Sequence, residues 1–126
     1  MSMNPLEVAD FKNTLDQFYG TETWHRFSMS KLLLTDGVKY LCEKAGCYWL
    51  MDIIASYQKK CMKDPMLRDF QIWELNVNIQ ERKGVVSCLR DTNDVAFKQT
   101  IPYTDFPLDT IKLYCENRVI CLPSER

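Results

Sequence analysis

The stretch Phe70-Gln71-Ile72-Trp73-Glu74-Leu75-Asn76-Val77-Asn78-Ile79 alternates apolar and polar side chains, and this alternation decides the fold. Successive side chains of a β-strand point to opposite faces of the sheet, so every second residue shares a face. One face would carry the apolar residues Trp73, Leu75, Val77 and Ile79. The other would carry Glu74, Asn76 and Asn78. The pattern predicts a strand that is buried on one side only.

Two more strands are predicted directly after this one. Residues 80–84 form a polar turn, and residues 85–89 are again apolar enough for a strand. Residues 91–94, Asp-Thr-Asn-Asp, form a second turn because such side chains bond their own backbone. A third strand is then expected over residues 95–103. Short turns join neighbouring strands, so the three strands predict an antiparallel meander.

The end of the chain predicts one last pair of elements. Residues 104–108, Thr-Asp-Phe-Pro-Leu, interrupt the strand pattern. Residues 111–115 and 119–122 are apolar and flank the polar residues 116–118. This pair is compatible with a short hairpin, or with a helix-like turn followed by a strand.

The beginning of the chain has the period of a helix instead. Asn4 is a suitable N-cap, Pro5 a favourable first residue, and Glu7 completes a capping box three residues after Asn4. The apolar stripe at helical spacing consists of Val8, Phe11, Leu15 and Phe18. We therefore expect a helix over residues 4–18, ended by Gly20.

Two further helices are predicted before the strands begin. The segment 21–34 is interpreted as a loop followed by a short helical turn. Thr35-Asp36-Gly37 can then cap a helix whose apolar positions recur every three to four residues, at Val38, Leu41, Cys42 and Ala45. Gly46 is expected to end or bend this helix. A more buried helix follows from Cys47 to about residue 60. Pro65 is expected to bar any further helix.

Helices that precede strands predict a two-layer α+β domain of about three helices packed on an antiparallel sheet of about four to five strands. No internal repeat, low-complexity stretch or linker divides the 126 residues. We therefore expect one domain over residues 1–126, with a helical half at about 4–63 and a strand half at about 67–123.

The composition excludes several classes of protein. Apolar residues make up 46% and charged residues 26% of the chain, as in an ordinary globular protein. No apolar run approaches the roughly 18 residues that would suggest a membrane span. The first residues, MSMNPLEVADF, lack the basic head and apolar segment of a signal peptide. The sequence therefore predicts a cytoplasmic protein with no membrane partner.

The charges argue against a nucleic-acid partner. The 16 Lys and Arg residues are balanced by 17 Asp and Glu residues, which gives a net charge of −1. Proteins that bind nucleic acids concentrate their basic residues on one face. The one local cluster here, Lys59, Lys60 and Lys63, lies at the predicted end of a helix, where basic residues compensate the helix dipole.

The six cysteines are expected to be reduced core residues. They are Cys42, Cys47, Cys61, Cys88, Cys115 and Cys121. A chain without a signal peptide meets a reducing compartment, where a free cysteine behaves as a small apolar side chain. Zinc sites use closely paired cysteines, often with histidine, whereas these spacings are loose and His25 is the single histidine. We therefore predict neither a disulfide framework nor a metal site.

No complete catalytic motif is present. A Ser or Cys nucleophile needs a base, usually histidine, so every such arrangement would have to use His25. The four glycines stand alone, which excludes the glycine-rich phosphate loops of nucleotide-binding folds. The sequence therefore predicts no cofactor and favours a protein that is not an enzyme.

Five residues are candidates for a functional or structural motif. Asp36 and Asp105 follow threonines in turn-like motifs, where a carboxylate can act in a site or can cap a helix or tie a turn. Tyr48 and Trp49 belong to the densest aromatic stretch, which suits either a core or an interface. Asp52 lies on the same predicted helix and, if buried, would need an ion-pair partner.

Four motifs together resemble a known family. They are Thr35-Asp36-Gly37-Val38-Lys39-Tyr40-Leu41, Ala45-Gly46-Cys47-Tyr48-Trp49-Leu50, Ile101-Pro102-Tyr103-Thr104-Asp105-Phe106-Pro107 and Leu122-Pro123-Ser124-Glu125. The combination resembles a family of small bacterial proteins with a domain of unknown function, associated with cyanobacteria, mobile elements and phages. The resemblance covers about residues 20–125. It implies a compact cytosolic domain and supplies no activity, cofactor or catalytic residue.

Three functions are compatible with these observations. The first is a non-enzymatic protein-protein interaction module that acts through a sheet face, an aromatic patch or a free strand edge such as that of the last strand, with a homodimer as one form of the complex. The second is a small ligand-binding or hydrolase-like domain that gathers Asp36, Tyr48, Asp52 and Asp105 where the helices meet the sheet. The third, suggested by the resemblance, is an inhibitor of a host or defence system. The interaction module is preferred because it requires no residue that the chain lacks.

Overall fold

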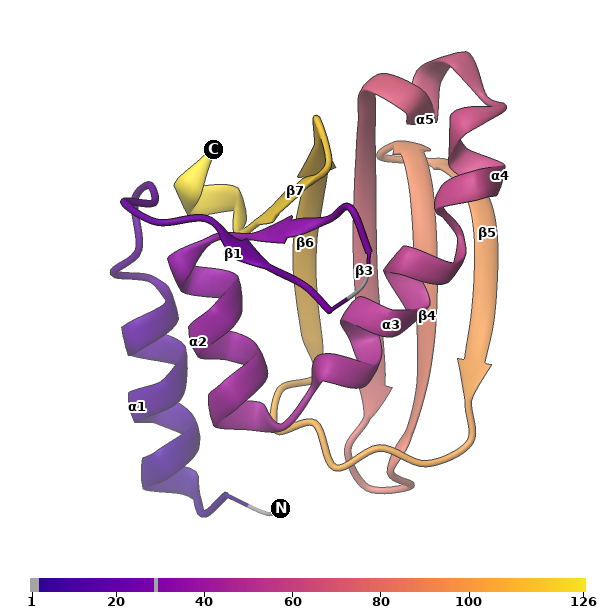
Figure 1. The fold of residues 1–126 in the computed structure, drawn as a ribbon. Coiled ribbons are helices and arrows are strands. Elements are labelled where there is room, and N and C mark those ends of the chain that lie inside the picture. The colour runs from indigo at the N-terminus through magenta and orange to yellow at the C-terminus, as the bar shows by residue number, and fades with distance from the viewer. Residues whose placement is uncertain (1–2, 29) are drawn as a thin grey trace.

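The computed structural model describes residues 3–28 and 30–126 and has a mixed α+β architecture. Helices lie on one face of a seven-stranded sheet whose strand order is β1-β2-β7-β6-β3-β4-β5 (Figure 1). The strands are β1 (His25–Arg26), β2 (Leu33–Leu34), β3 (Phe70–Asn78), β4 (Lys83–Asp91), β5 (Asp94–Ile101), β6 (Thr110–Glu116) and β7 (Val119–Cys121). The helices are α1 (Pro5–Leu15), α2 (Asp36–Ala45), α3 (Tyr48–Ser56), α4 (Gln58–Met62), α5 (Pro65–Asp69) and the short 3₁₀ helix η1 (Pro123–Glu125).

The predicted α+β class is correct, but the predicted arrangement is too simple. The sheet has more strands than the four to five expected, because β1 and β2 come from the segment assigned to a loop and a helical turn. The helices are also not all N-terminal, since η1 ends the chain.

The stretch that alternates apolar and polar residues forms β3, an internal strand of the sheet. It pairs antiparallel with β4 on one side and with β6 on the other. Trp73, Leu75 and Val77 are buried in the core, as expected. Ile79 does not share this face, because the strand ends at Asn78 and the Ile79 side chain is 49% exposed.

The last two strands form the hairpin that was one of the two predicted alternatives. β6 and β7 pair antiparallel through a tight turn in which Asn117 and Arg118 both have positive φ. β2 then pairs parallel with β7, where the Leu33 N–H donates to the Arg118 carbonyl at 2.8 Å. The last strand is therefore internal, and the expectation that it offers a free edge is wrong.

The first helix is capped as the sequence predicts. The Asn4 side chain accepts a hydrogen bond from the Glu7 N–H at 2.8 Å, and the Glu7 carboxylate accepts one from the Asn4 N–H at 3.1 Å. The helix ends at Leu15, three residues earlier than expected. Phe18 lies beyond the helix, and its ring packs against Tyr40 of α2 with 5.6 Å between the ring centres.

The helices before β3 depart from prediction at two points. The buried helix expected from Cys47 to about residue 60 divides at Tyr57 into α3 and α4. The expectation that Pro65 bars a further helix is wrong, because Pro65 is the first residue of α5. Proline is tolerated at this position, since the N–H of a first helical residue forms no hydrogen bond within the helix. The Asp64 carboxylate caps this helix by accepting from the Met66 N–H at 3.0 Å.

One hydrophobic core fills the space between the helices and the sheet. Its largest fully buried side chains include Trp73, Phe11, Leu41, Leu50 and Met51.

No helix within residues 3–28 and 30–126 combines the length and apolar character that crossing a membrane requires.

Candidate functional site

The predicted cap at the start of α2 is held by the end of the chain. The Thr35 hydroxyl accepts from the Val38 N–H at 3.4 Å and donates to Glu125 Oε1 at 2.6 Å. Glu125 Oε2 accepts from the Gly37 N–H at 3.0 Å. Glu125 Oε1 also accepts from the Leu122 N–H at 3.0 Å. The motifs that contain Thr35 and Glu125 therefore meet in one polar clasp.

Asp36 fixes the loop between α1 and β1. Its carboxylate accepts from the Glu22 N–H at 3.0 Å and shares a 2.8 Å hydrogen bond with His25 Nε2. Its own N–H donates to the Thr21 hydroxyl at 2.9 Å. The hydrogen bond from His25, followed by that from Glu22, lowers the pKa of Asp36 below its ordinary value. Asp36 and His25 thus form a pair at the surface, and no Ser, Thr or Cys side chain in the described residues is hydrogen-bonded to His25.

The pKa of Asp36 predicts an acid-sensitive contribution to stability. Because the folded-state pKa is lowered, the contribution is present above the unfolded-state pKa of about 3.9 and is lost as the pH falls through the folded-state pKa. We expect wild type to be more stable than Asp36→Asn at pH 6, with the difference shrinking below about pH 4. Urea unfolding of both proteins at a series of pH values measures this difference in stability. Asp52→Asn, which removes an exposed carboxylate, is the control. A difference that does not change with pH would contradict the assigned role.

The aromatic candidates lie on α3 and contribute mainly to packing. The Tyr48 ring stacks on Phe27, with ring centres 6.2 Å apart and planes 4° apart, and burial raises the pKa of Tyr48. Trp49 is half-buried and packs against the core. Asp52 is exposed, so the ion pair that burial would require is not needed. Among the described residues it forms none.

Asp105 lies in the connection between β5 and β6. It is half-buried and lines a hollow of about 410 Å³ together with Arg82 and residues at the start of α1 such as Val8. The neighbouring Thr104 hydroxyl accepts from the Phe106 N–H at 3.1 Å and so stabilises this turn.

The carboxylate candidates are distributed over the fold. Figure 1 shows that α2 begins at the end of the molecule where α1 finishes, whereas the connection between β5 and β6 runs along the opposite end. Asp36 is the first residue of α2 and Asp105 belongs to that connection, so the two lie toward opposite ends of the molecule. Asp52, in contrast, lies on the exposed side of α3. No group of three or more His, Cys, Asp or Glu side chains in the described part of the chain is placed to hold a metal ion.

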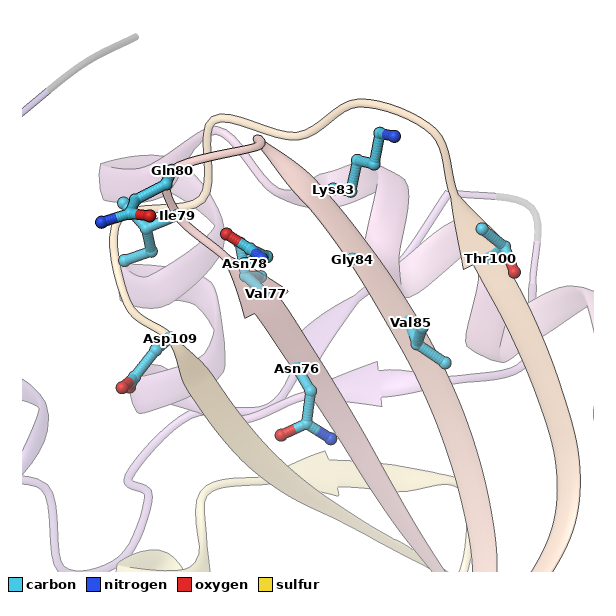
Figure 2. A pocket seen from close by; sticks show the side chains of 10 residues that line it. All are labelled: Asn76, Val77, Asn78, Ile79, Gln80, Lys83, Gly84, Val85, Thr100 and Asp109. Atoms are coloured by element: carbon cyan, nitrogen blue, oxygen red, sulfur yellow. The ribbon is translucent and has the colours of Figure 1, made fainter.

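A groove of about 800 Å³ lies at one end of the sheet (Figure 2). It is lined by the ends of β3, β4 and β5 and by the turn after β3, with Asp109 just before β6. The lining residues are Asn76, Val77, Asn78, Ile79, Gln80, Lys83, Gly84, Val85, Thr100 and Asp109. Among the described residues, the lining contains neither Ser, Cys nor His, so it lacks the Ser–His and Cys–His pairs of common nucleophilic sites. The sequence did not predict this groove, because the residues that line it come from several strands that only the fold brings together.

The cysteines are buried and unpaired, as predicted for core residues. Burial raises the pKa of Cys115 to about 12 and that of Cys121 to about 11, so both are neutral thiols at physiological pH. The Cys42 thiol donates to the Cys47 carbonyl at 4.0 Å, and the Cys47 thiol donates to the Leu41 carbonyl at 3.7 Å. The neighbouring Cys88 thiol lowers the pKa of Cys61 below its ordinary value. Neutral, buried thiols are poor nucleophiles, so Cys115 and Cys121 serve packing.

Comparison with known proteins identifies a family. The resemblance to a domain of unknown function is confirmed, because the model of a family of unknown function, DUF6876, matches residues 9–126. No curated protein and no solved structure matches the chain significantly. With nearly the whole sequence matched, this chain belongs to the family of unknown function DUF6876.

Proposed function

We propose that this protein is a non-enzymatic interaction module that binds a second copy of itself along the outer edge of β5. The observation that carries the proposal is the place of β5 as the last strand of the sheet. None of the described strands pairs with its outer edge, although β5 is 8 residues long. The other edge strand, β1, has 2 residues and offers little backbone for pairing.

An edge strand of this length exposes a row of unpaired backbone N–H and C=O groups, which another strand can bind. Natural sheets usually protect long edges with proline, charges, β-bulges or a covering element. The pairing of β5 with β4 shifts register only between Cys88 and Asp91 of β4, near the start of β5. Within the regular part of β5, residues 97–101, the sequence has no proline and one charged residue, Lys98. On the face of β5 that points toward the helices, Tyr57 covers the Phe97 ring, with ring centres 5.2 Å apart. A partner would therefore bind the backbone groups along the outer edge of β5.

The residues of β5 favour a second copy as that partner. Two identical edges pair antiparallel about a twofold axis, so each residue opposes one fixed residue of the other copy. An axis at Gln99 places Phe97 opposite Ile101 and Lys98 opposite Thr100. This register joins apolar side chains on the core face and avoids the like-charge pair that an axis at Lys98 would create. The register follows from residues 97–101, which pair with β4 without a shift.

Light scattering of the purified chain tests the proposal. We expect a dimer at about 100 μM, and we expect Gln99→Lys to raise its dissociation constant about tenfold or more because two lysines would then face each other at the axis. Gln99 also accepts a hydrogen bond from the Tyr57 hydroxyl at 3.2 Å. Tyr57→Phe removes that bond without adding charge and is the matched control, which should remain dimeric. A wild-type monomer at this concentration would refute the proposal.

The register has its own test. Residues that oppose each other in antiparallel strands have Cα atoms about 4.5–5.5 Å apart, within reach of a disulfide. Gln99→Cys is therefore expected to form a covalent dimer on mild oxidation, since its two copies meet at the axis. Thr100→Cys lies opposite Lys98 instead and should cross-link far less. Equal cross-linking of both variants would argue against an axis at Gln99.

We further propose that the module works in the cytoplasm of a bacterium or phage-infected cell. The buried, unpaired thiols support a reducing compartment, and the resemblance described above suggests the source. If a foreign protein rather than a second copy occupied β5, the protein would be an inhibitor, as the third sequence hypothesis states. Co-purification with a stoichiometric partner that Gln99→Lys releases would favour that alternative over self-association.

A further inference from the structure

We propose that a cleft between α4, residues 30–32 and the β6–β7 hairpin binds a small phosphorylated molecule, of the size and character of a nucleoside monophosphate. The cleft consists of two adjoining hollows of about 430 and 400 Å³. Both are lined by Gln58, Met62 and Arg118, which make them continuous. The site is separate from the β5 edge and does not depend on the proposed dimer.

Four cations surround the cleft. They are Lys31, Lys59, Arg68 and Arg118. None of the described residues that line the two hollows is acidic. Within the described part of the chain, none of the four cations forms an ion pair with a carboxylate. In a protein whose net charge is −1, this arrangement concentrates positive potential at one place, which attracts a small anion.

The two arginines suit a phosphate in particular. Guanidinium groups bind phosphate oxygens through two parallel hydrogen bonds. The Nε of Arg68 donates to the Met62 carbonyl at 3.0 Å, which orients its side chain beside the cleft. Arg118 stands at the tip of the β6–β7 hairpin with φ of 65°, a conformation that favours glycine. An arginine at this position is conformationally costly, which is consistent with a role for its side chain.

The floor of the cleft is rigid and partly apolar. Gln58 and Gln71 exchange two side-chain hydrogen bonds of 2.9 Å, and Gln71 is 2% exposed. Gln71 also accepts from the Trp73 indole N–H at 2.9 Å, so the amide pair is anchored in the core. The first hollow adds Leu32, Ala55 and Met62 to this polar floor.

The combination of floor and rim defines the ligand class. The apolar side chains can cover a base or a similar ring, while the cations at the rim hold its phosphate. Each hollow is within the range of small-molecule sites, roughly 300–1,000 Å³. A polymer would instead require basic residues along an extended face, whereas these four cations converge on one cleft.

Calorimetric titration with adenosine 5′-monophosphate tests the site. We expect binding to the wild-type chain at concentrations up to about 1 mM, and we expect adenosine without phosphate to bind at least about tenfold more weakly. Arg118→Gly should weaken binding of the nucleotide about tenfold while the protein remains at least as stable, because glycine prefers the φ of this position. Thermal unfolding of the same variant checks the second point.

Arg82→Gly is the matched control. Arg82 also has positive φ, 56°, but it lies in the turn between β3 and β4 and lines neither hollow. Its replacement should leave nucleotide binding unchanged. The proposal is overturned if the nucleotide does not bind, or if both variants bind it as wild type does. Binding of single-stranded RNA that tightens strongly with length, while the mononucleotide remains silent, would assign the cleft to nucleic acid and also refute the proposal.

Discussion

Trp73→Ala is expected to lower the free energy of unfolding by about 3–5 kcal/mol, the largest effect of any substitution considered for this protein. Trp73 is 2% exposed in the middle of β3, between β4 and β6. Its ring packs against Tyr57, with ring centres 5.9 Å apart. Its indole N–H donates to Gln71 Oε1, so truncation removes a buried hydrogen bond as well as a large apolar volume.

Urea unfolding followed by far-ultraviolet circular dichroism measures this loss without relying on tryptophan fluorescence. Trp24→Ala is the matched control, because the Trp24 side chain is 54% exposed and its removal should change stability by less than about 0.5 kcal/mol. A loss for Trp73→Ala as small as that of the control would contradict its place at the centre of the core.

The elements that could be predicted are those whose cause is local. The alternation from Phe70 to Asn78 marks β3, because a strand with one buried face needs that period. Thr35 marks the start of α2, because a threonine hydroxyl can accept from an amide three residues on. Asn4 and Glu7 mark the start of α1 for the same reason. In each case the deciding interaction spans no more than a few residues.

The elements that escaped prediction depend on contacts between distant segments. β2 has only Leu33 and Leu34, and it is a strand because β7, more than 80 residues later, lies beside it. A window around these leucines contains nothing that distinguishes a strand from a helical turn. Pro65 illustrates a different error, since a proline that ends one helix can begin the next.

The same limit applies to the candidate sites. Asp36 was a candidate from the sequence because of its Thr-Asp-Gly motif. Its hydrogen bond to His25 could not be predicted, because the two residues are 11 positions apart and do not form a known motif. The β5 edge is visible only once the strand order is known. The cation cleft combines Lys31, Lys59 and Arg118, which no continuous segment brings together. The numbers of basic and acidic residues in the chain are nearly equal, but the fold gathers four basic side chains at this one cleft.

Gly37→Ala is expected to lower the free energy of unfolding by about 2 kcal/mol, although alanine is the better helix former. A Cβ at this position would lie 2.7 Å from Glu125 Oε1 and 2.7 Å from Leu122 Cδ1. A glutamate side chain could usually move away. Here it is held by Thr35, by the Gly37 N–H and by the Leu122 N–H, so the methyl group would break part of the clasp that closes the start of α2.

A double-mutant cycle with Glu125→Ala separates the clasp from simple crowding. Glu125→Ala alone should cost about 2 kcal/mol, because it leaves the partly buried groups of Thr35 and Gly37 without their acceptor. Gly37→Ala should then cost less than half as much in the Glu125→Ala background as in wild type, since the carboxylate it would displace is already gone. The two substitutions would thus be coupled by about 1 kcal/mol, measured by urea unfolding of the four proteins. If Gly37→Ala lowers the free energy of unfolding equally in both backgrounds, the added methyl group conflicts with Leu122 alone. The contact with Glu125 would then not be the reason why position 37 requires a glycine.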